Sequence, residues 1–209
     1  PEGRDTYIGR QLTIASGQQQ ARDESRRYHL LARLGEGGFG TVYQAEDTFF
    51  NNRSVAIKSI HLIGLSTSQI IEATDGFNRE VMLLSGLEHP HLPRIYDHFT
   101  DPEHWYLVME YLNGETLEDY LQTYQENFVS FADSGMEYGC LLPLAEICDI
   151  AWQLCEVLDY LHTRQSPIIF RDLKPSNIMR TRNGHLYLID FGIARIFKPG
   201  QSKDTIPFG

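Results

Sequence analysis

The chain has 209 residues, with 18 basic and 28 acidic side chains and a formal net charge of −10. This length allows one domain or two small lobes, and a hydrophobic content of 42% is typical of a soluble globular protein. The acidic balance argues against a nucleic-acid-binding protein, which normally presents a basic face. No apolar run approaches the roughly 18 residues that span a bilayer, and no secretory signal opens the sequence.

The three cysteines, Cys140, Cys148 and Cys155, form no Cys-x-x-Cys pair. Cys148 and Cys155 lie seven residues apart in a helical pattern, so we interpret them as small apolar core residues without a metal or disulfide role. We therefore expect a reducing, cytoplasmic setting. Because the chain begins with Pro1, we expect it to be a piece of a longer protein.

The first half of the chain alternates between strand and turn patterns. Residues 1–27 are polar without a lasting apolar period, which predicts a disordered leader or linker. Segments rich in β-branched and aromatic residues predict five strands, over residues 28–34, 41–45, 54–60, 92–99 and 105–110. A helix is predicted over about 68–87, with Phe77, Val81 and Leu84 on one buried face.

The second half is predicted to be mainly helical. Residues 112–115 are interpreted as a hinge, and Thr116 begins a short helix. We expect residues 124–142 to be an irregular insert, longer than an ordinary connection. A strong apolar stripe then predicts a helix, with one face formed by Leu144, Ile147, Ala151, Leu154, Leu158 and Leu161.

Chemistry-bearing residues concentrate after this helix. The apolar run 168–170 leads into Asp172, with Lys174 two residues on and Asn177 five residues on. The strand-like stretch 186–189 then precedes Asp190-Phe191-Gly192. Two carboxylates, an ammonium and an amide on short loops are suited to binding metal ions and orienting a hydroxyl.

The stretch Gly35-x-Gly37-x-x-Gly40 is a weak signal by itself, since it also occurs where a dinucleotide-binding crossover begins. A crossover places a helix directly after the glycines, whereas Thr41-Val42-Tyr43 favours a strand. A glycine-rich hairpin can lie over phosphates because its backbone approaches them closely. An ordinary tight turn remains the alternative.

Lys58 is a cation on the otherwise apolar strand 54–60, so it needs an anionic partner if it is buried. Glu80, on the buried face of the next predicted helix, is the natural carboxylate. The alternative is a snorkelling surface lysine and a solvated glutamate.

Taken together, these motifs resemble the catalytic domain of eukaryotic-type serine/threonine protein kinases, bacterial ones included. The resemblance implies an α+β fold of two lobes, with a five-stranded antiparallel sheet and one helix over 28–112 and an incomplete, mainly helical lobe over 113–209. It implies Mg²⁺ and ATP as cofactors and a protein serine or threonine as substrate. Small-molecule phosphotransferases of related fold are the alternative enzyme class.

The resemblance also assigns roles. Asp172 would accept the proton of the substrate hydroxyl, Lys174 would meet the γ-phosphate, and the Lys58–Glu80 pair would position the other phosphates. Asn177 and Asp190 match the metal-binding positions. The residues implied to surround ATP are Leu34, Gly35, Gly37, Gly40, Val42, Ala56, Lys58, Met109, Glu110, Leu112 and Met179.

Two departures from the family stand out. Phe170 occupies a position where most kinases have histidine, and we expect it to fill that volume with little loss of activity. The chain stops at Gly209, before the Ala-Pro-Glu motif and later helices, so we expect the helix of residues 144–163 to expose apolar area. A nucleotide-binding pseudokinase or an inactive fragment remains the alternative to an active enzyme. Thr205 is a candidate phosphorylation site.

Overall fold

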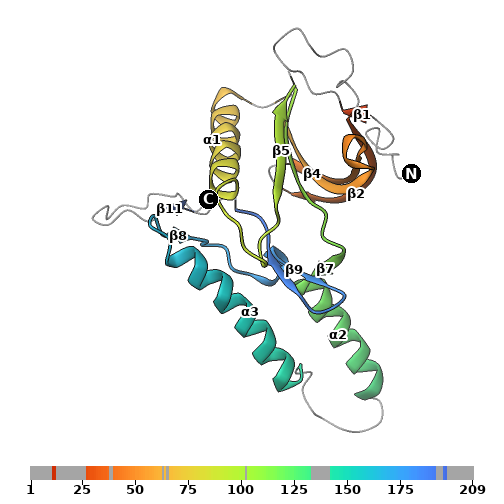
Figure 1. The fold of residues 1–209 in the computed structure, drawn as a ribbon. Coiled ribbons are helices and arrows are strands. Elements are labelled where there is room, and N and C mark those ends of the chain that lie inside the picture. The colour runs from red at the N-terminus through yellow and green to blue at the C-terminus, as the bar shows by residue number, and fades with distance from the viewer. Residues whose placement is uncertain are drawn as a thin grey trace. The chain divides into compact units, whose positions relative to one another are not determined.

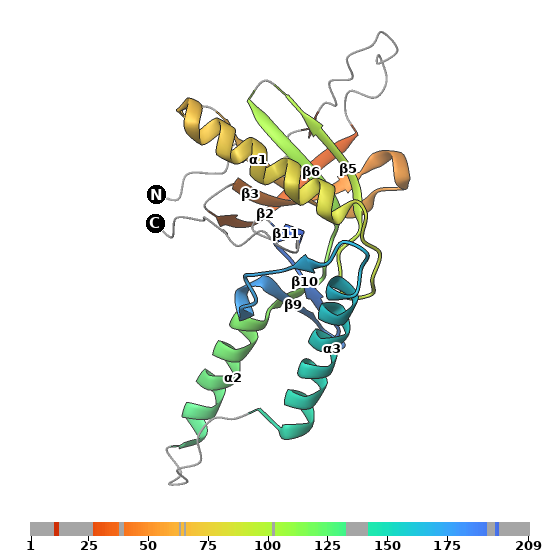
Figure 2. The same cartoon turned by 90° about the vertical axis from the view of Figure 1, so that its left-hand side faces the viewer.

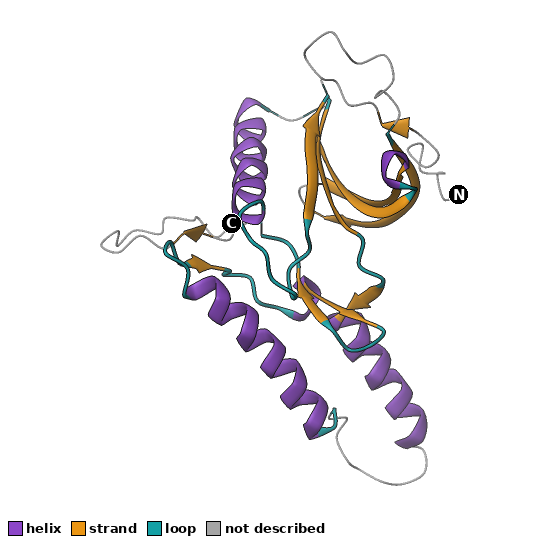
Figure 3. Cartoon of the chain, viewed as in Figure 1, coloured by secondary structure: helices purple, strands orange, loops and turns teal. Residues whose placement is uncertain are grey.

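The computed structural model describes residues 11–12, 27–37, 40–62, 64, 66–101, 103–132, 142–191 and 195–196. The chain divides into two compact units, Pro1–Gly114 and Glu115–Gly209. In the described residues, the first unit consists of a sheet and one long helix, and the second of two long helices with short strands (Figure 1; Figure 3).

One antiparallel sheet, in the order β1-β2-β3-β4-β6-β5, organises the N-terminal unit. Its strands are β1 (Gln11–Leu12), β2 (Tyr28–Gly37), β3 (Gly40–Asp47), β4 (Arg53–His61), β5 (Ile95–Thr100) and β6 (His104–Glu110). The five predicted strands are confirmed, although β5 begins at Ile95 and not at residue 92. The prediction of a wholly disordered leader is wrong for β1, which pairs with β2.

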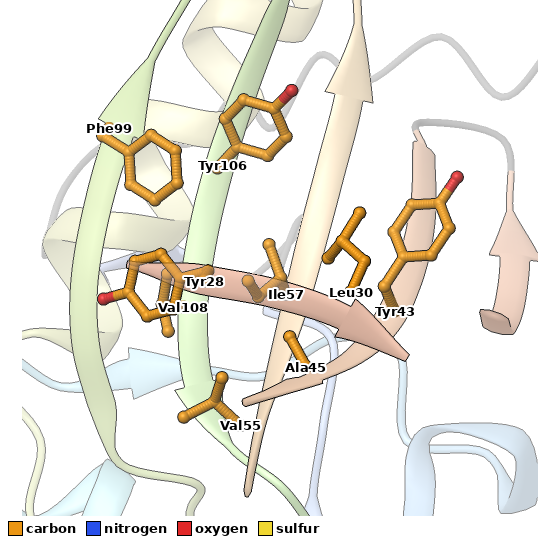
Figure 4. Close-up of a cluster of buried hydrophobic side chains, with 9 residues drawn as sticks. All are labelled: Tyr28, Leu30, Tyr43, Ala45, Val55, Ile57, Phe99, Tyr106 and Val108. Carbon is orange, nitrogen blue, oxygen red and sulfur yellow. The ribbon is translucent and has the colours of Figure 1, made fainter. Parts of the chain in front are cut away.

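The core of this unit lies on one face of the sheet. Tyr43, Ile57 and Val108 are directly opposite one another on β3, β4 and β6, and they alternate with residues that face the other way. Two aromatic stacks, Tyr28 on Phe99 and Phe99 on Tyr106, close the cluster, which Figure 4 shows. The buried members of this cluster are Tyr28, Leu30, Tyr43, Ala45, Val55, Ile57, Phe99, Tyr106 and Val108.

The helix α1 (Thr67–Leu84) lies alongside this sheet in both views (Figure 1; Figure 2). It begins with a capping box in which the Ser66 hydroxyl accepts from the Gln69 N–H and the Gln69 side chain accepts from the Ser66 N–H. Its predicted apolar face is buried, and Phe77 contacts Trp105 of β6 with ring centroids 5.4 Å apart. The 3-10 turn η1 (Thr48–Phe50) connects β3 to the Asn51-Asn52 turn before β4.

A buried ion cluster fixes the start of β2 against the rest of the sheet. Asp47 has no solvent exposure and accepts two hydrogen bonds of 2.8 Å from Arg27 and one of 3.1 Å from Arg53. Arg27 also donates to Asp97 of β5 at 3.1 Å, and Tyr28 donates to the same carboxylate. Arg27, which we assigned to the leader, is therefore an integral part of the folded unit.

The C-terminal unit contains α2 (Leu117–Ala132) and α3 (Leu144–His162). Its short elements are β7 (Gly114–Thr116), β8 (Ile168–Ile169), η2 (Pro175–Asn177), β9 (Ile178–Thr181), β10 (Leu186–Leu188) and β11 (Arg195–Ile196). The strands β10, β9 and β7 form one small sheet, and β11 pairs with β8 in another. The predicted helix at residue 144 and the predicted strand near residue 186 are confirmed.

The helix α2 corrects one prediction. The backbone remains helical to Ala132, so residues 124–132 are not irregular, while residues 133–141 lie outside the described part of the chain. The Thr116 hydroxyl accepts from the Asp119 N–H, and acidic residues occupy the first turn, which stabilises the helix start. A strong start of this kind allows the helix to continue through a segment of mixed composition.

Hydrogen bonds of four side chains tie the C-terminal elements together. Glu146 of α3 accepts hydrogen bonds from Tyr120 of α2 at 2.6 Å and from Arg180 of β9 at 3.1 Å. Gln153 of α3 donates to the Gly184 carbonyl and accepts from the Leu186 N–H, which holds the β9–β10 hairpin. These contacts fix the hairpin that follows the chemistry-bearing loop.

Only part of α3 is buried among the described residues. Val157 and Leu161 are buried, whereas Leu144 and Trp152 remain 76% and 68% exposed. Exposed apolar area on this helix was predicted. Cys148 and Cys155 are exposed free thiols, so their interpretation as core residues is wrong. No helix in the described ranges is both long enough and apolar enough to cross a membrane.

Candidate active site

Four of the predicted nucleotide-binding residues lie on one face of the N-terminal sheet. Val42 of β3 is directly opposite Lys58 of β4, and Ala56, two residues before Lys58 on β4, is directly opposite Met109 of β6. Because opposed residues of antiparallel strands share a face, these four side chains form one patch. This face is opposite to that of the core cluster, and it is also the face that α1 covers, since Trp105 belongs to it.

Lys58 is half-buried in this patch, as expected for a cation that must be paired. Glu80 lies in α1, one turn after the buried Phe77, but its side chain is outside the described part of the structure. The predicted Lys58–Glu80 pair therefore stays a prediction. The backbone places Glu80 on a helix that packs on the same sheet face as Lys58.

The glycine-rich stretch forms the predicted hairpin, with Gly37 paired to Gly40 between β2 and β3. Gly40 has a φ of +150°, and a Cβ there would collide with the Ser59 backbone of β4. At Gly35, by contrast, an added Cβ meets nothing within 4 Å. One glycine of the motif is thus required by packing within the sheet, whatever the hairpin binds, while residues 38 and 39 lie outside the described part.

The remaining predicted nucleotide contacts lie near the ends of β2 and β6, except for Met179. Leu34 of β2 is 48% exposed, so it is free of the core cluster. Glu110 ends β6, and its N–H donates to the Arg94 carbonyl while its carboxylate accepts from the Arg94 N–H. Leu112, two residues later, is half-buried. Met179 belongs to the C-terminal unit, where it lies on β9 opposite Tyr187.

The loop between β8 and η2 brings together two of the predicted catalytic residues, Asp172 and Lys174, and the predicted metal ligand Asn177. The Asn177 side-chain N–H groups donate to the Asp172 carboxylate at 2.8 Å and to the Asp172 backbone carbonyl at 3.0 Å. Lys174 contacts the same carboxylate oxygen, Oδ2, at 2.9 Å. Asn177 is only 6% exposed, so a buried amide holds the loop closed around a carboxylate that remains partly open to solvent.

Carboxylates near this loop stabilise the charged form of Lys174. The hydrogen bond from Lys174 to Asp172 raises the pKa of the lysine, and the carboxylates of Asp190 and Glu118 add to the effect. Lys174 is therefore a stable cation at neutral pH. Because Asn177 uses its nitrogen for Asp172, its oxygen is the end that remains to ligate a metal ion. An amide oxygen and the Asp190 carboxylate are hard ligands that suit Mg²⁺.

Two buried phenylalanines pack against each other beside the site: Phe170 precedes the loop that contains Asp172, and Phe191 directly follows Asp190. Their rings meet edge to face with centroids 4.9 Å apart, and they are 2% and 0% exposed. Between them, the Ile189 N–H donates to the Asn177 carbonyl, which ties the strand before Asp190 to the loop. Phe170 therefore fills a buried volume, as the sequence predicted.

Two non-glycine residues of the site have a left-handed backbone. The φ of Arg171 is +72° and that of Asp190 is +64°. Such conformations cost about 1–3 kcal/mol and cluster at functional sites, where the surrounding structure enforces them. After Phe191, the strand β11 returns to pair with β8, so Ile196 lies opposite Ile168 just before the loop. Gly192 and Thr205 lie outside the described residues.

The protein kinase domain family matches residues 28–207. The chain belongs to this family. It is 36% identical over 186 residues to serine/threonine-protein kinase pkn2 of Myxococcus xanthus, which covers 88% of this chain and 20% of that protein. It is 34% identical over 170 residues to serine/threonine-protein kinase PrkC of Bacillus subtilis (strain 168), covering 81% of this chain and 23% of that protein.

A third relative is the probable serine/threonine-protein kinase PknB of Lactococcus lactis, 33% identical over 181 residues, or 86% of this chain and 25% of that protein. The chain thus spans about a fifth to a quarter of the length of these relatives. The matches confirm the predicted family and its fold, and the N-terminal unit contains the five predicted antiparallel strands, joined by β1 as a sixth, and the predicted helix.

Sequence reasoning missed the ion cluster around Arg27 and a histidine pair at the end of β4. Both consist of residues far apart in the chain, so no local sequence pattern indicates them. In the described residues, no group of three or more His, Cys, Asp or Glu side chains is placed to hold a metal ion. The metal-binding roles of Asn177 and Asp190 therefore stay predictions.

Proposed function

We propose that this chain carries the nucleotide-binding and catalytic residues of a serine/threonine protein kinase, which transfers the γ-phosphoryl group of ATP to a protein hydroxyl. The observation that supports this most is the Asp172–Asn177–Lys174 arrangement. The Asp172 oxygen Oδ2 accepts from the Asn177 amide and also contacts the Lys174 ammonium. A fixed, partly exposed carboxylate beside a cation is what hydroxyl activation next to a phosphate requires.

In this proposal Asp172 is the general base. Its Oδ2 is held by Asn177 and Lys174, so Oδ1 is the oxygen that would accept the proton of the incoming serine or threonine hydroxyl. Lys174 keeps its proton because Asp172 raises its pKa, so it can neutralise charge that develops on the transferred phosphoryl group. Catalysis of this type is mainly positioning and electrostatic stabilisation.

Asn177 and Asp190 would hold Mg²⁺ through their side-chain oxygens. The metal ion supplies neutralisation of the phosphate charge when it is bound. Lys58, paired with Glu80, would bind the α- and β-phosphates, and the patch of Val42, Ala56 and Met109 would contact adenine together with Met179. The strand register that gathers the patch on one sheet face supports this assignment.

The proposed partner is a protein with accessible serine or threonine side chains. The Lys174-Pro175 pair after the proposed catalytic aspartate resembles serine/threonine kinases, and the relatives pkn2 and PrkC are named serine/threonine-protein kinases. We also propose a cytoplasmic setting, in line with three cysteines that form no Cys-x-x-Cys pair in the sequence.

A phosphoryl-transfer assay with labelled ATP, Mg²⁺ and a generic protein substrate tests the proposal. We expect incorporation into serine and threonine but not tyrosine, and a drop of about 10²–10⁴-fold in Asp172→Asn. The matched control is Asp159→Asn, the same change at an exposed position of α3. If the chain binds nucleotide but shows no phosphoryl transfer that depends on Asp172, the pseudokinase alternative is supported instead.

A further inference from the structure

The β9–β10 hairpin of the C-terminal unit connects the two proposed metal ligands. Asn177 directly precedes β9, and Asp190 follows the last residue of β10 by two positions. The two strands are paired over the whole length of β10. Beyond β10, the Ile189 N–H donates to the Asn177 carbonyl at 3.0 Å. The position of β10 beside β9 therefore sets the separation of Asn177 and Asp190.

The half-buried Gln153 of α3 holds the other end of this hairpin. Its Oε1 accepts from the Leu186 N–H at 2.9 Å, and its Nε2 donates to the Gly184 carbonyl at 3.1 Å. Nε2 also donates to Asp149 on the same helix at 2.8 Å. Both donors and the acceptor of the amide are thus engaged, which fixes its orientation. The reversed orientation would set an amide N–H against the Leu186 N–H.

The strand β10 needs support of this kind. It contains three residues and is an edge strand, because β9 is its neighbour in the sheet order β10-β9-β7. A hairpin of such short strands is only marginally stable by itself. Leu186 and Leu188 are each 1% exposed, but apolar burial is not directional, whereas a hydrogen bond has narrow limits of distance and angle. The bonds from Gln153 reach the main chain, so they hold the strand and its turn directly.

The backbone at Asp190 makes the position of β10 more important. Asp190 has a φ of +64°, and a left-handed conformation of this kind persists only where the surrounding structure enforces it. The strand β10 is the segment that leads into Asp190. A shift of β10 would therefore let the backbone at Asp190 relax and would move its carboxylate.

We propose that Gln153 is a positioning residue of the phosphoryl-transfer site, which fixes β10 and thereby places Asp190 relative to Asn177. This inference rests on the proposed function. The printed contacts of Gln153 are with the hairpin and with Asp149, so it acts through the main chain of β10 and not on the reacting atoms. In a site of this kind, a displacement of about 1 Å can cost about 10²-fold in rate.

Replacement of Gln153 by methionine tests this role. Methionine has a similar length, but it has no donor and is only a weak acceptor. The hydrogen bond from Arg180 of β9 to Glu146 of α3 stays in place, so we expect the hairpin to remain on the helix. The matched control is Asp149→Ala, which removes the third bond of Gln153 and leaves both bonds to the hairpin. A control for stability alone is Val157→Ala, which removes buried apolar volume from the same helix.

Amide hydrogen exchange, followed by NMR, gives a result that does not depend on catalysis. In Gln153→Met, we expect the Ile189 N–H to exchange about 5–100-fold faster, because two hydrogen bonds that hold β10 are lost. This increase should exceed that of the amides within α3. In Asp149→Ala the rate at Ile189 should not change, and in Val157→Ala it should change no more than the rates within α3. An unchanged rate at Ile189 in Gln153→Met would overturn the proposal.

The second measurement is the Mg²⁺ concentration needed for half-maximal phosphoryl transfer. In Gln153→Met we expect it to rise about 3–10-fold, less than the 10–100-fold that loss of a direct partner of a metal ligand costs. Asp149→Ala and Val157→Ala should leave it unchanged. Normal Mg²⁺ dependence in Gln153→Met would show that Gln153 has only a structural role, and the proposal would fail. Absence of Asp172-dependent transfer in the unchanged chain would instead refute the proposed function itself.

Discussion

Replacement of Arg27 by alanine should strongly destabilise the N-terminal unit. The change removes both 2.8 Å hydrogen bonds to Asp47 and the 3.1 Å bond to Asp97. Asp47 has no exposure, so its charge stays buried, and among the described residues Arg53 and the Phe49 N–H are the partners that remain. Removing one partner of a buried ion pair costs about 3–5 kcal/mol. Because Arg53 remains, we expect about 3 kcal/mol, the lower end of this range.

Urea unfolding measures this cost. Of the two tryptophans, Trp105 lies in β6 and Trp152 is exposed on α3. Trp152→Phe therefore leaves Trp105 as a fluorescence reporter of the N-terminal unit. In that background, Arg27→Ala should lower the free energy of unfolding by about 3 kcal/mol and Tm by about 6–12 °C.

The matched control is Arg33→Ala on the same strand. Arg33 is bonded to Glu36 at 3.0 Å, but these side chains are 50% and 66% exposed, so the loss should stay below about 1 kcal/mol. If Arg27→Ala and Arg33→Ala had equal effects on the free energy of unfolding, burial of Asp47 would not control the strength of its ion pairs. The reasoning from the structure would then be refuted.

Four further predictions follow from the same structure. Burial opposes ionisation of Asp47, but the hydrogen bonds from Arg27 lower the pKa of this carboxyl group below the usual 3.8. The ionised Asp47 therefore stabilises the fold above pH 3.8, and this stabilisation is lost as pH falls through the lowered pKa. Acid titration followed by Trp105 fluorescence should show the difference between the unchanged chain and Arg27→Ala shrinking below pH 3.8, and a constant difference would contradict this. Gly40→Ala should destabilise the unit by about 1–3 kcal/mol because its Cβ meets the Ser59 backbone, whereas Gly35→Ala has open space, as paired urea titrations would show. Phe170→Ala should lower the free energy of unfolding of the C-terminal unit by about 3–5 kcal/mol, because it removes a ring that is 2% exposed; Trp152 fluorescence would follow the unfolding. Phe170→His should change kinase turnover little. A many-fold gain in turnover would show that the phenylalanine limits catalysis. Asn177→Ala should raise the Mg²⁺ concentration needed for half-maximal transfer and lower turnover, because it removes both the proposed metal ligand and the bonds that hold Asp172. An unchanged Mg²⁺ dependence would exclude Asn177 as a ligand.

The predictable features of this chain are those encoded over short distances. The alternation of β-branched residues located the strands, and the spacing of Phe77, Val81 and Leu84 located the buried face of α1. The loop of residues 172–177 could also be predicted, since Asn177 lies only five residues after Asp172, to which its side chain donates. Where the pattern repeats within one or two turns, the sequence carries the information by itself.

The errors arose where partners are remote or absent. Arg27 is bonded to residues 20 and 70 positions away, and no local pattern reveals such pairs. The thiols of Cys148 and Cys155 lie on a helix with clear apolar periodicity, but periodicity does not say which face is covered. In α2, aromatic residues were interpreted as irregular structure although a strong helix start precedes them.

The left-handed backbone of Arg171 and Asp190 restricts what an engineer can place there. Valine or isoleucine at either position would clash with its own main chain, whereas asparagine tolerates this conformation almost as well as aspartate. Asp190→Asn is therefore the substitution that removes a negative charge while it preserves the path of the chain. A comparison of Asp190→Asn with Asp190→Val would separate the electrostatic role of this residue from its conformational one.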